Sequence, residues 1–519
     1  MSRFAAVILA AGKGTRMKSH IPKVTHAVGG RPMLEHVLRA ASETVSRANG
    51  AAADPANDAE DHSPRYVVVV GHERERVENA VTWTPPDGEI VYITQEPQLG
   101  TGDAVRHALA AWQNEPLPQT ILVLYGDTPL VRAETLSRLI REHDARGATL
   151  TFLTGHTGRD TDYGRVLRDG AGRITGIVER KHATPEEVAI PEVNSGIYCF
   201  ESDWLRSRLG RLDSHENGEY YLTDLIAVAV TEDQPIATAS ASLEETLGVN
   251  DRVQLAEAEA VMRRRVLEDL MRSGVTVEDP ATTYVQPNVH VGADTILRPG
   301  TRVTGATIIG ERCDIGPNSV VRDSTIGDDC AVLASWVEEA TMCDGSFIGP
   351  MSHLRPGARL ETGARLGNYA EVKNATIGRD VQMHHFSYVG DATIGADSNV
   401  GAGVITMNYD GSEKHHTEVG ERVFLGSDTL LRAPITVGEG ASTGAGAVVT
   451  RDVPPGALVA GVPARVIRRV RSQRADEAVE ADAARHPTEP TAETKQRSTQ
   501  PAGTLPDMRE GEGGRDSGG

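Results

Sequence analysis

At 519 residues the chain is too long for one compact core, and we expect two or more domains. Its formal net charge of −20 argues against nucleic acid or an anionic membrane as a partner, because a phosphate backbone is bound mainly by clustered Lys and Arg. No apolar run approaches the roughly 18 residues that cross a bilayer, and the 4 cysteines lack the spacing of a secreted disulfide framework, so we predict a cytoplasmic protein without membrane insertion.

The N-terminal stretch AAVILAAGKGTRM predicts a buried strand followed by a glycine-rich loop. It begins like a secretion signal but ends in a Gly/Lys/Arg cluster instead of a small-residue cleavage site. Its spacing also differs from the Walker motif, which needs four residues between its first Gly and the Gly-Lys-Ser/Thr. The glycines alone are equally compatible with an ordinary turn between a strand and a helix. The nearby charges of Arg16 and Lys23 favour a phosphate site built on backbone N–H groups.

Up to about residue 250, short Val/Ile/Leu-rich strands such as RYVVVVGH alternate with helical segments such as TGDAVRHALAAW. This alternation is typical of an open, largely parallel α/β sheet. Segment 49–65 is acidic, rich in Ala and Pro and without periodicity, which predicts a solvated surface loop. Apolar residues at helical spacing over 251–273, with Gly274 as a stop signal, predict a linking helix.

A six-residue period follows the linking helix. Leu354, Leu360 and Leu366 stand six apart, and motifs such as IGERC, IGDDC and IGRDV recur along this half of the chain. Such a period places one aliphatic side chain per short strand inside a narrow interior, which predicts a parallel β-helix. The block 406–418 interrupts the period and is expected to loop out. The tail after about residue 473 has few aliphatic residues, which predicts disorder.

The motifs, taken together and in order, resemble those of one family. The first half carries LAAGKGTRM with a later Pro-Lys, LGTGDA, LYGDTPL, DYGRV, GIVERK, VNSGIY and GVNDR, which are similar to sugar-phosphate nucleotidyltransferases. The second half adds LRPGA, NYAEVKNA, HHFSYVGDA, NVGAG and NYDG. From about residue 2 to 470 the chain therefore resembles the bifunctional N-acetylglucosamine-1-phosphate uridyltransferase/glucosamine-1-phosphate N-acetyltransferase family.

This resemblance implies three segments of an α/β protein: a Rossmann-like uridylyltransferase domain over 1–250, a linking helix over 251–274, and a left-handed parallel β-helix acetyltransferase domain over 275–471. The composition predicts a fourth segment, a disordered tail over 472–519. The segment near Asp58 and the tail lie outside the family's shared pattern.

The N-terminal domain is implied to join UTP to N-acetylglucosamine 1-phosphate with release of pyrophosphate. Arg16 and Lys23 would be catalytic groups that stabilise phosphate charge, and Asp127 with Asn250 would bind Mg²⁺, a hard cation that prefers oxygen ligands. Taken singly, Asp127 could simply end its strand and Asn250 could cap the next helix. The residues implied to bind the nucleotide and the sugar are Leu9, Ala10, Ala11, Gly12, Lys23, Gln95, Gly100, Thr101, Tyr125, Gly126, Asp127, Gly164, Glu179, Asn194 and Asn250.

The β-helix is implied to transfer an acetyl group from acetyl-CoA to glucosamine 1-phosphate. His385 would be the general base, because the ordinary pKa of His lies near neutrality, and Glu371 would position it. A solitary His here would more often be structural, and no Cys/His set has zinc spacing. The implied contacts are Arg355, Lys373, Tyr388 and Asn399 for glucosamine 1-phosphate, and Ala402, Asn408, Tyr409, Ser427 and Ala445 for acetyl-CoA. The family also has an Arg at the acetyl-CoA site, near the C-terminal end of the β-helix, and Val462 stands at that position here.

Two other functions stay open on the residues alone. The β-helix could be a trimerisation and regulatory module on a nucleotidyltransferase with a single activity, although such a module would not need His385, Asn408 and Tyr409. The chain could also be a non-catalytic assembly subunit, against which the intact GKGTR, Pro-Lys and LYGD motifs argue. We predict a bifunctional enzyme of UDP-N-acetylglucosamine synthesis with Mg²⁺ as cofactor. UTP, acetyl-CoA and amino-sugar 1-phosphates would be its substrates, and the β-helix would form a homotrimer.

Overall fold

The computed structural model describes residues 3–469, except 53–63, 72, 159–160, 162 and 217. The predicted tail over 472–519 and most of the predicted loop over 49–65 lie outside the described residues. The first residues of that loop were predicted wrongly, because helix α1 (Met33–Ala52) continues through them. Within the described ranges we find no helix that is both long and apolar enough to cross a membrane.

The N-terminal part is built around a nine-stranded mixed sheet. Strands β5, β4, β1 and β6 pair in parallel, as the alternating pattern predicts, and β11 pairs in parallel with β7. Strand β10 runs antiparallel to both of its neighbours, β6 and β7. The main path of the sheet is β11 (Ile236–Ser240), β7 (Leu150–His156), β10 (Glu192–Glu201), β6 (Thr120–Tyr125), β1 (Phe4–Ala10), β4 (Arg65–Val70) and β5 (Glu89–Thr94).

Helices cover both faces of this sheet, because alternate residues of each strand point to opposite sides. In β1, Ala6 and Ile8 belong to a buried cluster with α1 and α4 (Ala133–Arg146). Ala5 and Val7 belong to a second cluster, which includes residues of α3 (Thr101–Ala108), α6 (Ser202–Leu209) and α7 (Asp224–Thr231). The carboxyl ends of β1 and β6 are thereby held in a fixed frame.

The predicted linking helix is confirmed as α8 (Arg252–Arg272). The side chain of Asp251 caps its start by accepting hydrogen bonds from two backbone N–H groups. Glu259 anchors the helix further along. One carboxylate oxygen accepts a 2.6 Å hydrogen bond from the backbone N–H of Gly29, in the turn between β2 (Ala27–Val28) and β3 (Arg31–Pro32). The other accepts from the hydroxyl of Tyr284 in the first coil of the β-helix, at 2.5 Å.

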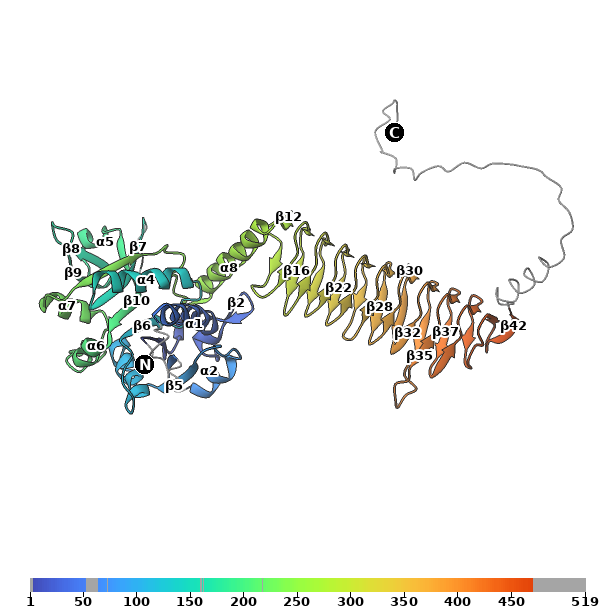
Figure 1. Ribbon diagram of the computed structural model, residues 1–519, viewed down its shortest axis with the longest axis horizontal. Coiled ribbons are helices and arrows are strands. Elements are labelled where there is room, and N and C mark those ends of the chain that lie inside the picture. The colour runs from blue at the N-terminus through green and yellow to red at the C-terminus, as the bar shows by residue number, and fades with distance from the viewer. Residues whose placement is uncertain are drawn as a thin grey trace, which may run out of the picture. The chain divides into compact units, whose positions relative to one another are not determined.

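The predicted β-helix is confirmed as three parallel sheets that the chain visits in turn. Figure 1 shows its short strands stacked coil upon coil. The first sheet runs from β12 (Thr276–Val277) to β42 (Arg465–Arg469), the second from β13 (Tyr284–Val285) to β40 (Val448–Val449), and the third from β14 (His290–Val291) to β38 (Ile435–Val437).

The six-residue period corresponds to one inward side chain per strand. Leu354, Leu360 and Leu366 are fully buried, and Leu354 lies opposite Val372 on the next coil. The interrupting block loops out, but over a shorter span than the predicted 406–418. The chain leaves the coil after β34 (Ile405–Met407) and rejoins it at β35 (Thr417–Val419), so both ends of the predicted block belong to strands.

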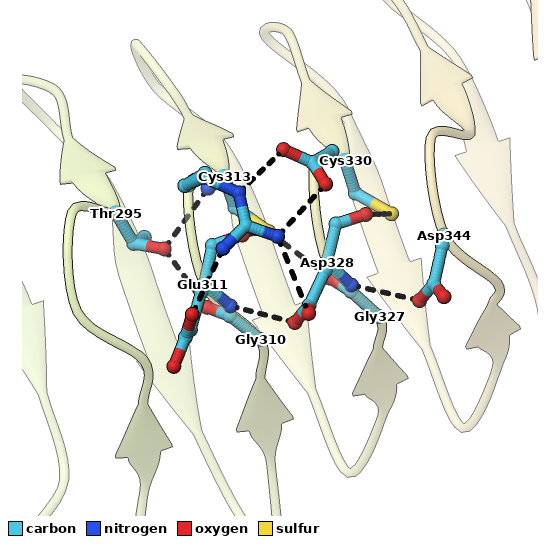
Figure 2. Close-up of polar contacts among 10 residues, drawn as sticks. Thr295, Gly310, Glu311, Cys313, Gly327, Asp328, Cys330 and Asp344 are labelled. Atoms are coloured by element: carbon cyan, nitrogen blue, oxygen red, sulfur yellow. Dashed lines mark hydrogen bonds and ion pairs between the residues drawn. The ribbon is translucent and has the colours of Figure 1, made fainter.

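The turns between strands are tied to neighbouring coils by side chains (Figure 2). Oδ1 of Asp328 accepts a 2.9 Å hydrogen bond from the backbone N–H of Glu311, and Oδ1 of Asp344 accepts one of the same length from Asp328. The Sγ of Cys313 donates to the backbone oxygen of Gly327 at 3.1 Å. Such contacts satisfy backbone groups that the parallel ladders leave unpaired and hold successive coils in register.

We expect Leu360→Ala to reduce the free energy of unfolding by about 2–5 kcal/mol, because truncation leaves a cavity in the narrow interior. The neighbouring Thr362 is exposed, and Thr362→Ala should change stability by less than about 0.5 kcal/mol. Denaturant unfolding of both variants tests this. Equal effects of the two substitutions would contradict the inward assignment of Leu360.

Candidate active sites

A cavity of about 510 Å³ opens where β1 and β6 end, the edge at which ligands of open α/β sheets gather. Its wall contains most of the residues predicted for the nucleotide site: Leu9, Ala10, Ala11, Gly12, Arg16, Lys23, Gln95, Gly100, Thr101, Tyr125, Asp127 and Asn250. The prediction omitted eight lining residues, namely Lys13, Gly14, Thr15, Val24, Gln98, Ala104, Glu219 and Tyr221. The first three stand in the glycine-rich loop itself and could have been included on that ground.

The lining of this cavity brings together three predicted residues from distant parts of the chain. The Nζ of Lys23 donates to Oδ2 of Asp127 and, at 3.1 Å, to Oδ1 of Asn250. A backbone hydrogen bond of 2.9 Å from Val249 to Asp127 holds the two segments side by side. Two oxygens therefore converge on one cationic group, which is the arrangement that a divalent cation with oxygen ligands needs. The residues present fit Mg²⁺.

The glycine-rich loop approaches Lys23 closely. Gly14 has a φ of 59°, in the left-handed region, and a Cβ there would lie 2.7 Å from the Cβ of Lys23. A Cβ on Gly12 would meet nothing within 4 Å. At Gly14 the loop thus packs against the Cβ of Lys23. At Gly12 it leaves open space, where a ligand can approach the backbone.

One side wall is held by the buried amide of Gln95. Its Nε2 donates to the backbone oxygen of Gly100 at 3.0 Å and to Oδ2 of Asp103 at 2.7 Å. The hydroxyl of Thr101 accepts from the backbone N–H of Leu222 at 3.0 Å. These contacts orient the amide of Gln95, because a carboxylate can only accept.

Four predicted residues do not line the cavity: Gly126, Gly164, Glu179 and Asn194. Gly164 and Asn194 are nevertheless joined, by a 2.9 Å hydrogen bond from the backbone N–H of Asn194 to the oxygen of Gly164. Gly196, whose backbone N–H donates to Oδ1 of Asn194 at 3.1 Å, lies against Tyr125, because a Cβ on this glycine would be 2.6 Å from the ring. Burial, with the charges of Asp127 and Glu179 nearby, raises the pKa of Tyr125 well above its usual value, so its phenol is neutral. The predicted sugar residues therefore gather around Tyr125.

The second group of predicted residues lies on the middle sheet of the β-helix. Strands β25 (His353–Leu354), β28 (Ala370–Lys373) and β31 (Ser387–Gly390) stack there, and Glu371 lies opposite Tyr388. The Nη1 of Arg355 donates to Oε1 of Glu371 at 2.7 Å. Among the described residues Glu371 accepts a hydrogen bond from Arg355, and its role in positioning His385 stays a prediction.

Positive charge concentrates beside this sheet. The ammonium group of Lys414 lies close to that of Lys373 and lowers the pKa of Lys373, and Arg355 contributes in the same direction. Lys414 belongs to the looped-out block and was not predicted as a site residue. Three cations from separate segments thus share one exposed area, which suits a phosphate group.

His385 lies at the corner between two sheets, after β30 (Gln382–Met383) and before β31, and its side chain is exposed, as is that of His384. The following coils continue the same corner. The backbone of Gly403 donates to Phe386 at 2.7 Å, that of Asp428 to Ala402 at 2.6 Å, and that of Gly446 to Ser427 at 2.8 Å. The predicted residues Ala402, Ser427 and Ala445 therefore follow His385 along one edge, coil by coil.

The remaining predicted residues flank this edge. Asn408 is buried and its Nδ2 donates to Oδ2 of Asp391, whereas Tyr409 is exposed and its hydroxyl donates to the oxygen of Gly411 at 2.8 Å. Asn399 lies on β33 (Asn399–Val400), on a different sheet from Tyr388. Val462, in place of the family's Arg, is exposed.

These features define a nucleotidyltransferase domain joined to a hexapeptide-repeat transferase. Residues 6–218 match the model of the MobA-like NTP transferase domain, and residues 306–334 and 417–451 match the hexapeptide repeat of succinyl-transferase. Among solved structures, a putative glucose-1-phosphate thymidylyltransferase from Bacillus anthracis matches 50% of this chain and 94% of its own, with a TM-score of 0.38 and 18% identity.

Curated relatives match over nearly the whole described chain. The bifunctional protein GlmU of Trichlorobacter lovleyi is 47% identical over 88% of this chain and 95% of its own length. Those of Corynebacterium glutamicum and Mycolicibacterium vanbaalenii are 44% and 46% identical, again over 88% of this chain and over 90% and 89% of their own lengths. The chain belongs to the GlmU family of bifunctional proteins. The family and the pair of transferase activities predicted from the motifs are thereby confirmed.

Proposed function

We propose that the cavity of the N-terminal sheet carries the uridylyl transfer of this bifunctional enzyme, and that the edge of the β-helix beginning at His385 carries the acetyl transfer. The observation that carries the first assignment is the convergence of Lys23, Asp127 and Asn250 in the cavity that the glycine-rich loop also lines. The cytoplasmic location stays a prediction.

The chemistry of uridylyl transfer suits this cavity. The attacking group is an ionised phosphate, so no general base is required, and catalysis depends on alignment and on neutralising charge at the α-phosphorus. Arg16 and Lys23 would supply that charge, and the backbone of residues 9–12 would hold the nucleotide. Asp127 and Asn250 would hold Mg²⁺, which when bound neutralises phosphate oxygens.

The wall formed by Gln95 suits a uracil base. Because the amide nitrogen of Gln95 is engaged by Gly100 and Asp103, its Oε1 is the group left to accept a hydrogen bond from a ligand. Uracil offers an N–H at ring position 3, where cytosine has an acceptor. Gly164, Glu179 and Asn194, gathered around Tyr125, would contact the sugar.

In the second site His385 would remove the proton from the amino group of glucosamine 1-phosphate as it attacks the thioester. A C–N bond forms, the C–S bond breaks, and CoA leaves as its thiolate. Arg355, Lys373 and Lys414 would hold the phosphate, and a backbone N–H near Ala402 would stabilise the oxyanion. Tyr388 and Asn399 would contact the sugar, and Asn408, Tyr409, Ser427 and Ala445 would contact acetyl-CoA.

The homotrimer is also part of the proposal. Large apolar side chains stand exposed on successive coils near the His385 corner, with Met351 61% exposed, Tyr369 64% and Phe386 57%. Met351 and Tyr369 have φ values of 57° and 58°, in the left-handed region that is unfavourable for bulky residues. Exposed apolar rows of this kind mark interaction surfaces.

We expect sedimentation equilibrium of the whole chain to give three times its mass of 55.5 kDa. Tyr369→Arg should shift the protein towards smaller species, because a charge cannot be desolvated in an apolar interface without cost. A monomer at micromolar concentration for the wild type would contradict the trimer.

We expect Asp127→Ala to abolish pyrophosphate release and to leave CoA release unchanged, because the metal is needed only where phosphate charge builds up. Both products can be measured on one preparation, so each activity controls for the folding of the other half. Loss of both activities in a folded variant would count against two separate sites.

We expect His385→Ala to reduce acetyl transfer by roughly 100-fold or more, as removal of a positioned general base usually does. Because Arg355 and Lys373 are retained, KM for glucosamine 1-phosphate should change little while kcat falls. His384→Ala is the matched control and should retain activity. Activity lost in His384→Ala but retained in His385→Ala would identify His384 as the general base. Full activity in both variants would favour a regulatory β-helix.

A further inference from the structure

Asp391 joins three segments beside the proposed acetyl-transfer site. It occupies the turn between β31 and β32 (Ala392–Ile394), and its Oδ1 accepts a 2.6 Å hydrogen bond from Nδ2 of Asn374 on the preceding coil. Its Oδ2 accepts from Nδ2 of Asn408, at the start of the looped-out block. Its backbone oxygen accepts from the backbone N–H of Thr417 at 3.1 Å, where that block rejoins the coil.

The turn itself does not require these side-chain contacts. Asp323 occupies the corresponding turn four coils earlier in the β-helix, after β19 (Val320–Arg322), and has the same φ of 47°. Its Oδ1 accepts a 2.8 Å hydrogen bond from the backbone N–H of Ala306, an ordinary contact between coils. At Asp391 both carboxylate oxygens instead accept from side-chain amides. The left-handed conformation explains an Asp in this turn but not its two amide partners.

The chemistry of a carboxylate fixes the orientation of Asn408. An ionised carboxylate accepts hydrogen bonds and cannot donate, so the amide of Asn408 must present its NH₂ group to Asp391. Its Oδ1 is thereby turned away from Asp391, and no donor among the described residues forms a hydrogen bond to that oxygen. The Oδ1 of Asn408 is therefore a hydrogen-bond acceptor that a ligand can use.

Asp391 is held in its ionised form. Burial alone would raise the pKa of Asp391, but the hydrogen bonds from Asn374 and Asn408 and the nearby charges of Lys414 and Lys373 lower it overall. The same negative charge also offsets part of the positive potential of the two lysines, which are proposed to hold the phosphate.

We propose that Asp391 is a positioning residue for acetyl transfer, which holds the amide of Asn408 so that its carbonyl oxygen accepts a hydrogen bond from the amino group of the sugar during attack. This inference rests on the proposed acetyl-transfer site and gives Asn408 a contact with the sugar amine in addition to its proposed contact with acetyl-CoA. Asp391 itself touches no substrate, and its effect passes through Asn408. The oxygen of Asn408 would direct one N–H of the amine, which leaves the other proton for His385.

The test is Asp391→Asn in the full chain. An amide at position 391 has nearly the shape of the carboxylate but can donate as well as accept, so the amide of Asn408 is free to reverse. We expect kcat for acetyl transfer to fall about 10-fold, the scale of one charged hydrogen bond. KM for glucosamine 1-phosphate should stay the same or decrease, because a negative charge beside Lys373 and Lys414 is removed.

Two internal controls separate this result from a loosened fold. Uridylyl transfer by the same protein should be unchanged, and Asp323→Asn, in the corresponding turn, should leave both activities unchanged. A drop in kcat accompanied by a raised KM, or an equal effect of Asp323→Asn, would show that Asp391 is only structural. Wild-type kcat in Asp391→Asn would overturn the inference and leave the proposed function standing, whereas absent acetyl transfer in the wild type would overturn both.

A paired exchange gives an independent readout. In Asp391→Asn/Asn408→Asp the new carboxylate at 408 again presents an acceptor to the amine, while the amide at 391 donates to it. We expect the double variant to recover part of the kcat lost in Asp391→Asn. Asn408→Asp alone places two carboxylates against each other and should be the least active of the three. A double variant no better than either single variant would contradict the proposed orientation.

Discussion

The constraint on which the second half of the molecule depends is the register between coils. Parallel pairing fixes each strand over its counterpart, at a spacing of about 4.8 Å. Residues far apart in sequence therefore become neighbours at one corner, as Phe386, Gly403 and Asp428 show through their backbone hydrogen bonds. A row of functional groups can be built in this way from single residues of successive coils. The inward aliphatic side chains maintain the register by filling the interior at every strand.

This register also explains how the looped-out block can add to the site without disturbing the fold. The strand that follows the block regains the register of the β-helix, because Thr417 of β35 pairs with Ala392 of β32 on the preceding coil. Residues 408–416 are thereby released from the repeat and bring Asn408 beside Asp391 and Lys414 beside Lys373, both of which belong to regular coils. In the N-terminal half, functional residues are instead brought together by the segments that follow β1 and β6, which place Lys23 and Asp127 in one cavity.

Periodicity made much of the fold predictable, since few folds other than a β-helix place an aliphatic residue at every sixth position. It did not encode strand direction, and the antiparallel β10 was accordingly not foreseen. Motifs located most of the cavity residues, but no local signal placed Lys23 against Asp127 across a separation of 104 residues. Lys414 was missed because a Lys in an exposed loop resembles any solvated charge. The hydrogen bond between Arg355 and Glu371 was not predicted because it depends on the register between coils.

The central claim is that one chain carries two chemically separate sites, of which only the N-terminal one depends on a metal. The most direct measurement supplies the wild-type protein with glucosamine 1-phosphate, acetyl-CoA, UTP and Mg²⁺, and follows CoA thiol and pyrophosphate in parallel as EDTA is added. We predict that both products form and that EDTA stops pyrophosphate release while CoA release continues. Loss of both products on chelation, or formation of only one product at the start, would contradict the account.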